Sequence, residues 1–170
     1  MEIEITLHDN SILKYQPGLP VDFKGPVLKG AKAVWSKSGF TEIVLQQLTG
    51  INYFIRVTTG KLLKNITIKS SPNNFGLHSN LALKNEVRKD VKSIGKFHLR
   101  EDQFICYFTG ESQARLAFEP GEAFKTIDFF YTPKLLKELV PFYPELEKYL
   151  IKKPTKILNG KGGWISLSMK

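Results

Sequence analysis

Short segments with the composition of β-strands follow one another from residue 2 to residue 130, and they constrain the fold more than any other feature. In the first segment, Ile3 and Ile5 alternate with Glu2 and Glu4, as in a strand with one buried face. Later segments are rich in Ile, Val, Phe, Tyr and Thr. They span residues 31–35, 41–48, 53–58, 61–69, 77–84, 91–99, 103–108, 113–118 and 123–130. So many short strands in 170 residues predict a mainly β sandwich, jelly roll or barrel.

Turn signals separate these segments at residues 58–60, 71–74 and 119–122. In the last of these, Pro120 fixes φ at the first central position, and Gly121 accepts a positive φ at the second. This order is typical of a type II turn. No helical pattern interrupts the strands, which argues against an RNA-recognition fold.

Two short amphipathic helices are expected after the last strand. Thr132 is a suitable N-cap with Pro133 in the first helical position, and Pro141 ends that helix. Pro144 opens a second helix. The apolar faces would be formed by Leu135, Leu136, Leu139 and Val140, and by Leu146, Tyr149 and Leu150. Helices this short must pack on the β unit, on each other or on a partner subunit.

The composition is that of an ordinary globular domain, with a formal net charge of +9. Such a charge suggests nucleic acid as a partner, yet most basic residues are scattered Lys, whereas base-reading sites use Arg, Asn and Gln. The sequence lacks an apolar run of about 18 residues and a signal peptide. Cys106 is the one cysteine, which excludes an internal disulfide. We expect a cytoplasmic protein without membrane contact.

No catalytic or metal-binding constellation is found. His8, His78 and His98 lie far apart in sequence and do not match the spacing of a metal-binding cupin. His78 and His98 would form a metal site only by meeting across strands. Cys106 lies in an apolar strand, where cysteine is usually a small buried hydrophobe. Residues 160–163 resemble a phosphate loop only superficially. We expect no catalytic residue, metal or cofactor.

The β segments are unusually rich in aromatic residues. Most belong to a core, and a few would line a cavity at the mouth of a barrel, where small-molecule sites are common. Arg56 interrupts an apolar strand on the face of Phe54, as either a solvated charge or an anchor for an anion. The candidate ligand-binding residues are Tyr53, Arg56, His78, Phe104 and Tyr107.

Several segments resemble AraC-type transcriptional regulators from Bacteroidetes-like bacteria. Residues 41–48 and 53–57 resemble their early strands, and residues 103–108 resemble a mid-domain strand. Residues 124–146 resemble the exit from a cupin-like barrel into a helical pair. Residues 165–169 resemble the linker that leads to two helix-turn-helix motifs.

This resemblance implies the N-terminal regulatory domain of such a protein. Residues 1–131 would be a cupin-like jelly-roll sensor, residues 132–153 a helical pair on the barrel or at a dimer interface, and residues 154–170 a linker toward an absent DNA-binding domain. The domain would sense a small-molecule effector, form a homodimer, or do both, and DNA would be bound only by the missing part. The expected dimer interface is Leu135, Leu136, Leu139, Leu146, Tyr149 and Leu150.

Two other functions stay open at this point. A metal-dependent cupin-type enzyme, such as an isomerase or a dioxygenase, would require bound metal. A carbohydrate-binding sandwich would require exposed aromatic residues on one face and usually export, yet Trp35 and Trp164 lie far apart in sequence.

Overall fold

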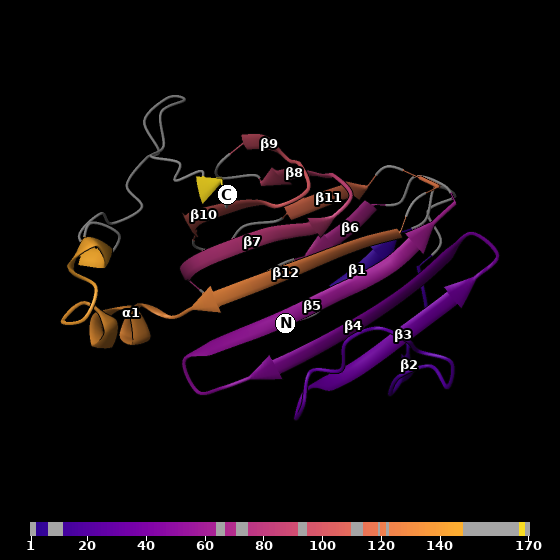
Figure 1. Ribbon diagram of the computed structural model, residues 1–170, viewed down its shortest axis with the longest axis horizontal. Coiled ribbons are helices and arrows are strands. Elements are labelled where there is room, and N and C mark those ends of the chain that lie inside the picture. The colour runs from indigo at the N-terminus through magenta and orange to yellow at the C-terminus, as the bar shows by residue number, and fades with distance from the viewer. Residues whose placement is uncertain are drawn as a thin grey trace.

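The computed structural model describes residues 3–6, 12–63, 67–70, 75–91, 95–109, 114–118, 120–121, 123–147 and 167–168, with the backbone alone for residues 3–6, 67–70, 109, 114–115 and 167–168. Two antiparallel sheets lie face to face, with the larger sheet in front in Figure 1. In spatial order, the larger sheet contains β13 (Leu167–Ser168), β10 (Gln103–Thr109), β7 (Gly76–Lys84), β12 (Ala123–Tyr131), β5 (Tyr53–Leu62), β4 (Thr41–Thr49), β3 (Lys32–Ser38) and β2 (Gln16–Pro17). The smaller sheet contains β1 (Ile3–Thr6), β6 (Thr67–Ser70), β11 (Ala114–Phe118), β8 (Val87–Val91) and β9 (Gly95–Leu99). The predicted mainly β architecture is confirmed.

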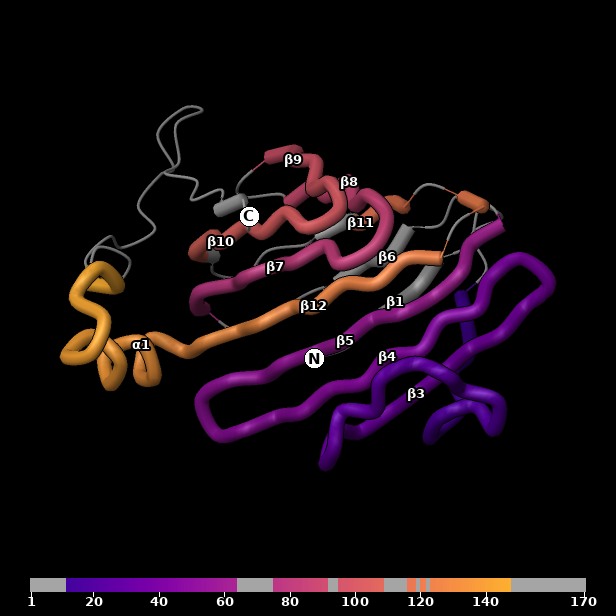
Figure 2. The backbone as a smooth tube through the Cα atoms, in the orientation of Figure 1, coloured from indigo at the N-terminus to yellow at the C-terminus, as the bar shows by residue number. Residues whose placement is uncertain are grey.

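The last long strand, β12, is central to the larger sheet. It runs between β5 and β7, which precede it by about 40 to 70 residues in the chain, as the orange tube in Figure 2 shows. Its residues alternate between buried and half-buried along most of its length, with Phe124, Thr126, Asp128 and Phe130 on the buried side. The strand therefore directs every second side chain between the two sheets.

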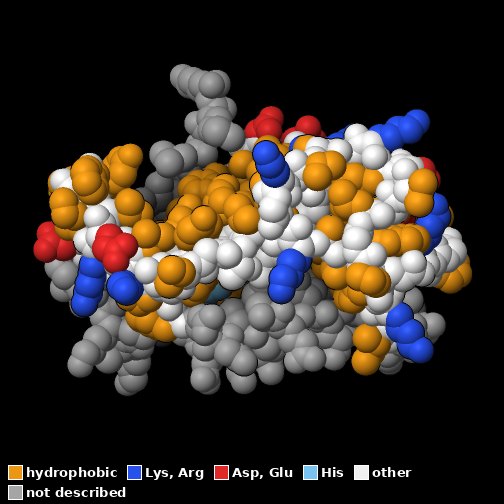
Figure 3. Space-filling model, turned by 90° about the horizontal axis from the view of Figure 1, so that it is seen from below, with side chains coloured by type: hydrophobic (Ala, Val, Ile, Leu, Met, Phe, Trp, Pro, Cys, Tyr) orange, Lys and Arg blue, Asp and Glu red, His pale blue; other side chains and the backbone are white. Residues whose placement is uncertain are grey.

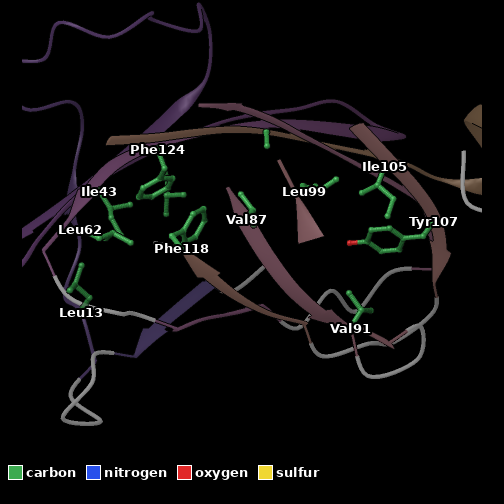
Figure 4. Close-up of a cluster of buried hydrophobic side chains, with 12 residues drawn as sticks. Leu13, Ile43, Leu62, Val87, Val91, Leu99, Ile105, Tyr107, Phe118 and Phe124 are labelled. Atoms are coloured by element: carbon green, nitrogen blue, oxygen red, sulfur yellow. The ribbon is translucent and has the colours of Figure 1, made fainter. Parts of the chain in front are cut away.

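The apolar core lies between the sheets (Figure 4). Both sheets contribute to it: Ile43 and Phe124 come from the larger sheet, and Val87 and Phe118 from the smaller one. Figure 4 also shows the Tyr107 hydroxyl pointing from β10 into this interior. A polar group of β10 is thus placed beside the apolar core.

Two strand boundaries differ from the prediction. The expected turn at residues 58–60 is wrong, because β5 continues through Gly60 to Leu62. A Cβ at Gly60 would lie 2.7 Å from the Phe124 ring and 2.6 Å from the Glu42 carbonyl oxygen, so glycine permits close packing here instead of marking a turn. The expected single strand over residues 91–99 is also wrong, because β8 ends at Val91 and β9 begins at Gly95.

Only one of the two expected α-helices is found among the described residues. In α1 (Pro133–Leu139), the Thr132 hydroxyl accepts a hydrogen bond from the Leu135 amide at 3.3 Å, as predicted for its N-cap. The second expected helix is wrong at Pro144, where a 3-10 turn, η1 (Pro144–Leu146), forms instead. The preceding residue, Tyr143, supplies no side-chain cap, and the Glu147 amide donates back to the Pro144 carbonyl, the shorter spacing of a 3-10 helix.

Replacing Gly60 by alanine is expected to destabilise the fold. The new methyl group would overlap the buried Phe124 ring and a backbone oxygen, and overpacking of this kind costs about 1–3 kcal/mol. Urea denaturation followed by circular dichroism measures the loss. The control is Gly39→Ala, since a Cβ at Gly39 has no neighbour within 4 Å. Equal stability of the two variants would contradict the packing role of Gly60.

A candidate ligand site in the polar interior

Lys89 is the central residue of a polar cluster between the sheets. In β8, the side chains of Val87, Lys89 and Val91 are buried and Arg88 is exposed, so alternation turns Lys89 toward the interior. Lys89 is only 7% exposed. Lysine is rarely buried to this degree unless it is paired, so its contacts need explanation.

The Lys89 ammonium contacts uncharged groups of the opposite sheet. Its Nζ donates to Asn80 Oδ1 on β7 at 2.6 Å and lies 5.2 Å from the centre of the Tyr107 ring on β10. The Tyr107 hydroxyl donates to the same Asn80 oxygen at 3.1 Å. Among the residues whose side chains the structure describes, Lys89 makes no ion pair within 4.0 Å. One amide oxygen therefore joins the two sheets.

A carboxylate and a guanidinium group occupy the other side of Asn80. Arg56, Asp128 and Asn80 lie opposite one another on the adjacent strands β5, β12 and β7. Arg56 Nε is 3.4 Å from Asp128 Oδ2, and both side chains are 11% exposed. Asn80 Nδ2 donates to Asp128 Oδ1. The Asn80 amide thus connects the carboxylate to the ammonium, in a cluster that contains two cations and one anion.

Burial is the main cause of the pKa shifts in this cluster. It lowers the pKa of Lys89 to about 8, an effect that Asp128 opposes and Arg56 strengthens. Burial also raises the pKa of Tyr107, and Asp128 raises it further. The pKa of Tyr15 is raised by burial and partly lowered again by nearby Arg56. The Tyr15 hydroxyl is buried without a hydrogen-bond partner among the described residues. Both phenols are therefore neutral donors near pH 7.

Aromatic rings line the cluster on its larger-sheet side. The His78 ring is stacked on Tyr107, with 5.5 Å between centroids, and lies 4.9 Å from Phe130. Phe54 is stacked on Phe130 at 5.2 Å, and the Arg56 guanidinium lies 5.5 Å from the Phe54 ring. These rings form an apolar wall beside charged groups, a combination typical of small-molecule sites.

The structure brings together three of the five predicted ligand-binding residues. Arg56, His78 and Tyr107 all face the interior. Tyr53 and Phe104 lie at alternating positions of β5 and β10, which turns them to the outer face of the larger sheet, and Tyr53 is 37% exposed.

Sequence reasoning missed Lys89, Asn80 and Asp128. A signal was present for two of them, because Lys89 is flanked at i−2 and i+2 by Val87 and Val91, and Asp128 shares one face of β12 with Phe124 and Phe130. A charge on the apolar face of an alternating strand indicates a buried polar site.

The predicted dimer residues are only partly described. Leu136 is 1% exposed and packs within its own chain, whereas Leu135, Leu139 and Leu146 are half-buried. Tyr149 and Leu150 lie outside the described residues. The end of the molecule that carries α1, at the left of Figure 3, exposes hydrophobic side chains. Phe142 and Tyr143, which follow α1 in the chain, are 76% and 54% exposed.

The described part of the chain gives less support to a metal site or a reactive cysteine. No group of three His, Cys, Asp or Glu side chains is arranged there to hold a metal ion. Cys106 lies on the outer face at 2.9 Å from Ser79 Oγ, and burial raises the pKa of its thiol, which disfavours the nucleophilic thiolate. None of the described helices has the length and apolar character needed to cross a membrane.

Comparison with known proteins finds only distant structural neighbours. No protein-family model and no curated protein matches the chain. Among solved structures, the Cnp3 cupin domain of Schizosaccharomyces pombe is 13% identical, with a TM-score of 0.44 over 56% of this chain and 69% of that one. A cupin domain of an XRE family transcriptional regulator from Enterobacter cloacae is 11% identical, with a TM-score of 0.45 over 54% of this chain and 97% of that one.

The AraC-like transcriptional activator CuxR is 13% identical, with a TM-score of 0.42 over 78% of this chain and 43% of that one. This chain therefore spans less than half the length of CuxR. At these identities and TM-scores, no site residue and no activity is transferred to the chain. The candidate site rests on its own geometry.

Replacing Lys89 by methionine is expected to stabilise the fold at neutral pH. Since the pKa of Lys89 falls from 10.5 unfolded to about 8 folded, the cost of its buried charge is full below about pH 8 and is relieved as the pH rises toward 10.5. The advantage of Lys89→Met should therefore shrink above pH 8, by up to about 1.4 kcal/mol per pH unit.

Urea denaturation of both proteins at about pH 7 and about pH 9.5 measures this difference. Asp128 on β12, Arg56 on β5 and Tyr107 on β10 face Lys89 and are unchanged in the variant. The exposed Lys61→Met substitution on β5 is the control and should show little pH dependence. A constant difference between Lys89→Met and the natural chain would contradict the assigned burial of an ammonium group.

Proposed function

We propose that this chain is the effector-sensing domain of a cytoplasmic AraC-type transcriptional regulator, with DNA bound by a part of the protein outside this chain. The buried cluster of Lys89, Asn80, Asp128 and Arg56 carries the proposal. Apolar residues of similar volume often stabilise a core at least as well as buried charges do. The need for a stable fold is therefore a weak explanation for a buried polar cluster at this position. The cluster is better explained as a set of oriented groups for a ligand. The regulatory role rests on the resemblance of sequence described above.

The same strand that carries Asp128 leads directly to α1. Asp128 and Phe130 face the interior, and the strand ends at Tyr131. The Thr132 amide then donates to the Asn52 carbonyl at 2.9 Å, which ties the start of α1 to the β4–β5 turn. A ligand that binds one arrangement of β12 more tightly than another would shift the position of α1 by population shift.

Dimerisation is proposed as the second part of the function, at the end that carries α1. Leu136 anchors the helix within the chain, while Leu139 and Leu146 stay half-buried and Phe142 and Tyr143 are exposed. Exposed aromatic residues are enriched at protein interfaces. In this arrangement, the surface that contacts a second subunit begins a few residues after the ligand cluster ends.

Ligand binding in the interior is tested by NMR titration of the isotope-labelled chain with neutral, anionic and cationic fragments. We expect amide shifts to change at Lys89, Asn80 and Asp128 and to stay constant on the outer face. Tyr107→Phe removes one inward hydroxyl and should weaken binding by roughly 2- to 10-fold, the value of one hydrogen bond. Tyr131→Phe, on the outer side of β12, is the matched control. Fragments that shift only outer-face amides would contradict the proposal.

Dimerisation is tested by sedimentation of the full chain over a range of concentrations. Phe142→Lys places a charge at an exposed site and should convert dimer to monomer while circular dichroism stays unchanged. Val21→Lys, at another exposed apolar residue far from α1 in sequence, is the control and should leave the dimer intact. If the Phe142→Lys variant still sediments as a dimer, this surface is not part of the interface.

A further inference from the structure

We propose that the ligand of the interior cluster is a monocarboxylate with an apolar body, whose carboxylate group is bound by the Lys89 ammonium and the Tyr107 hydroxyl. This inference rests on the proposed ligand-binding function and adds the chemical class of the ligand. It follows from the charges of the cluster, from the donors that it orients and from the walls around it.

The charges favour an anion. Lys89 is 7% exposed, and its hydrogen bond goes to the uncharged Asn80 amide. Asp128 is already engaged by Arg56 Nε and Asn80 Nδ2. Among the residues whose side chains are described, no carboxylate lies within ion-pair distance of Lys89. A buried ammonium in such surroundings is costly, and a carboxylate ligand would compensate its charge. A cationic ligand would instead face Lys89 and Arg56 together.

The donors are also arranged for an oxygen anion. An ammonium group has three N–H donors, and one of those of Lys89 is used by Asn80. Tyr107 is a neutral O–H donor, since burial raises its pKa, and it can turn its hydrogen from Asn80 to a ligand oxygen. Because Asp128 supplies one negative charge in the same cluster, a singly charged carboxylate fits better than a doubly charged phosphate.

The walls determine the rest of the ligand. Val87 and Val91 flank Lys89 on β8, and on the larger sheet the His78 ring contacts the rings of Tyr107 and Phe130. These surfaces suit an aromatic or aliphatic body and offer little to a polyhydroxylated one. The cluster therefore selects for an acid with one charged end.

The experiment compares carboxylates with their uncharged amides by thermal unfolding of the full chain. The pairs are benzoate and benzamide, phenylacetate and phenylacetamide, hexanoate and hexanamide, and octanoate and octanamide, at constant ionic strength. At least one carboxylate should raise the Tm by a few degrees, and its amide should bind at least roughly tenfold more weakly. Lys89→Met should abolish the difference, and Lys61→Met, an exposed lysine, should retain it.

The outcomes separate the two proposals. Equal binding of acid and amide, or a carboxylate effect that persists in Lys89→Met, would overturn the inference and leave an interior ligand site in place. A panel in which no carboxylate raises the Tm would also overturn it. The sensing function fails separately, in the NMR titration, if no neutral, anionic or cationic fragment shifts an inward-facing amide.

Discussion

The hydrogen bond from Lys89 to Asn80 is the interaction on which the interior depends. It crosses from the smaller sheet to the larger one inside an apolar core, and at 2.6 Å it fixes how β8 faces β7. Hydrophobic contacts between the sheets are non-directional and tolerate small shifts of one sheet on the other. A buried ammonium does not tolerate such a shift, because moving it away from Asn80 and the Tyr107 ring leaves its charge without a partner. The polar contact therefore sets the alignment of the sheets at this point, although it contributes little to their net attraction.

Asn80 is the residue that makes the cluster a unit. Its amide donates to Asp128 and accepts from Lys89 and Tyr107, so four strands share one planar group: β7, β8, β10 and β12. Such networks respond as a whole, because the orientation of the amide that satisfies one partner is required by the others. A ligand that engaged Lys89 or Tyr107 would therefore act on Asp128 as well. Since Asp128 lies on the strand that continues to Thr132 and α1, this coupling would give the proposed function a physical path from the interior to the exposed end of the molecule.

The sequence predicts the features that depend on neighbouring residues. The strand over residues 123–130 and the Thr132-Pro133 helix start are set by local sequence, and both are confirmed. The turn expected at Gly60 failed because glycine there makes room for Phe124, a contact across some 60 residues that no local pattern contains. The candidate site divides in the same way. Arg56 is visible as an interruption of an apolar strand, whereas its neighbours Asp128 and Asn80 are brought to it only by the pairing of β5, β12 and β7.

Burial gives Lys89 two opposite effects, and the proposed sensing function would depend on their balance. The absence of water raises the free energy of the charged ammonium and lowers its pKa to about 8, so the cluster weakens the unliganded fold near neutral pH. The same absence of water strengthens its attraction for an opposite charge. A bound carboxylate would then recover much of the cost of burial, and it would raise the pKa of Lys89 back toward its usual value. Carboxylate binding at buried Lys89 would therefore stabilise the fold more than carboxylate binding at an exposed lysine. This gain in stability would be the free energy available to move α1.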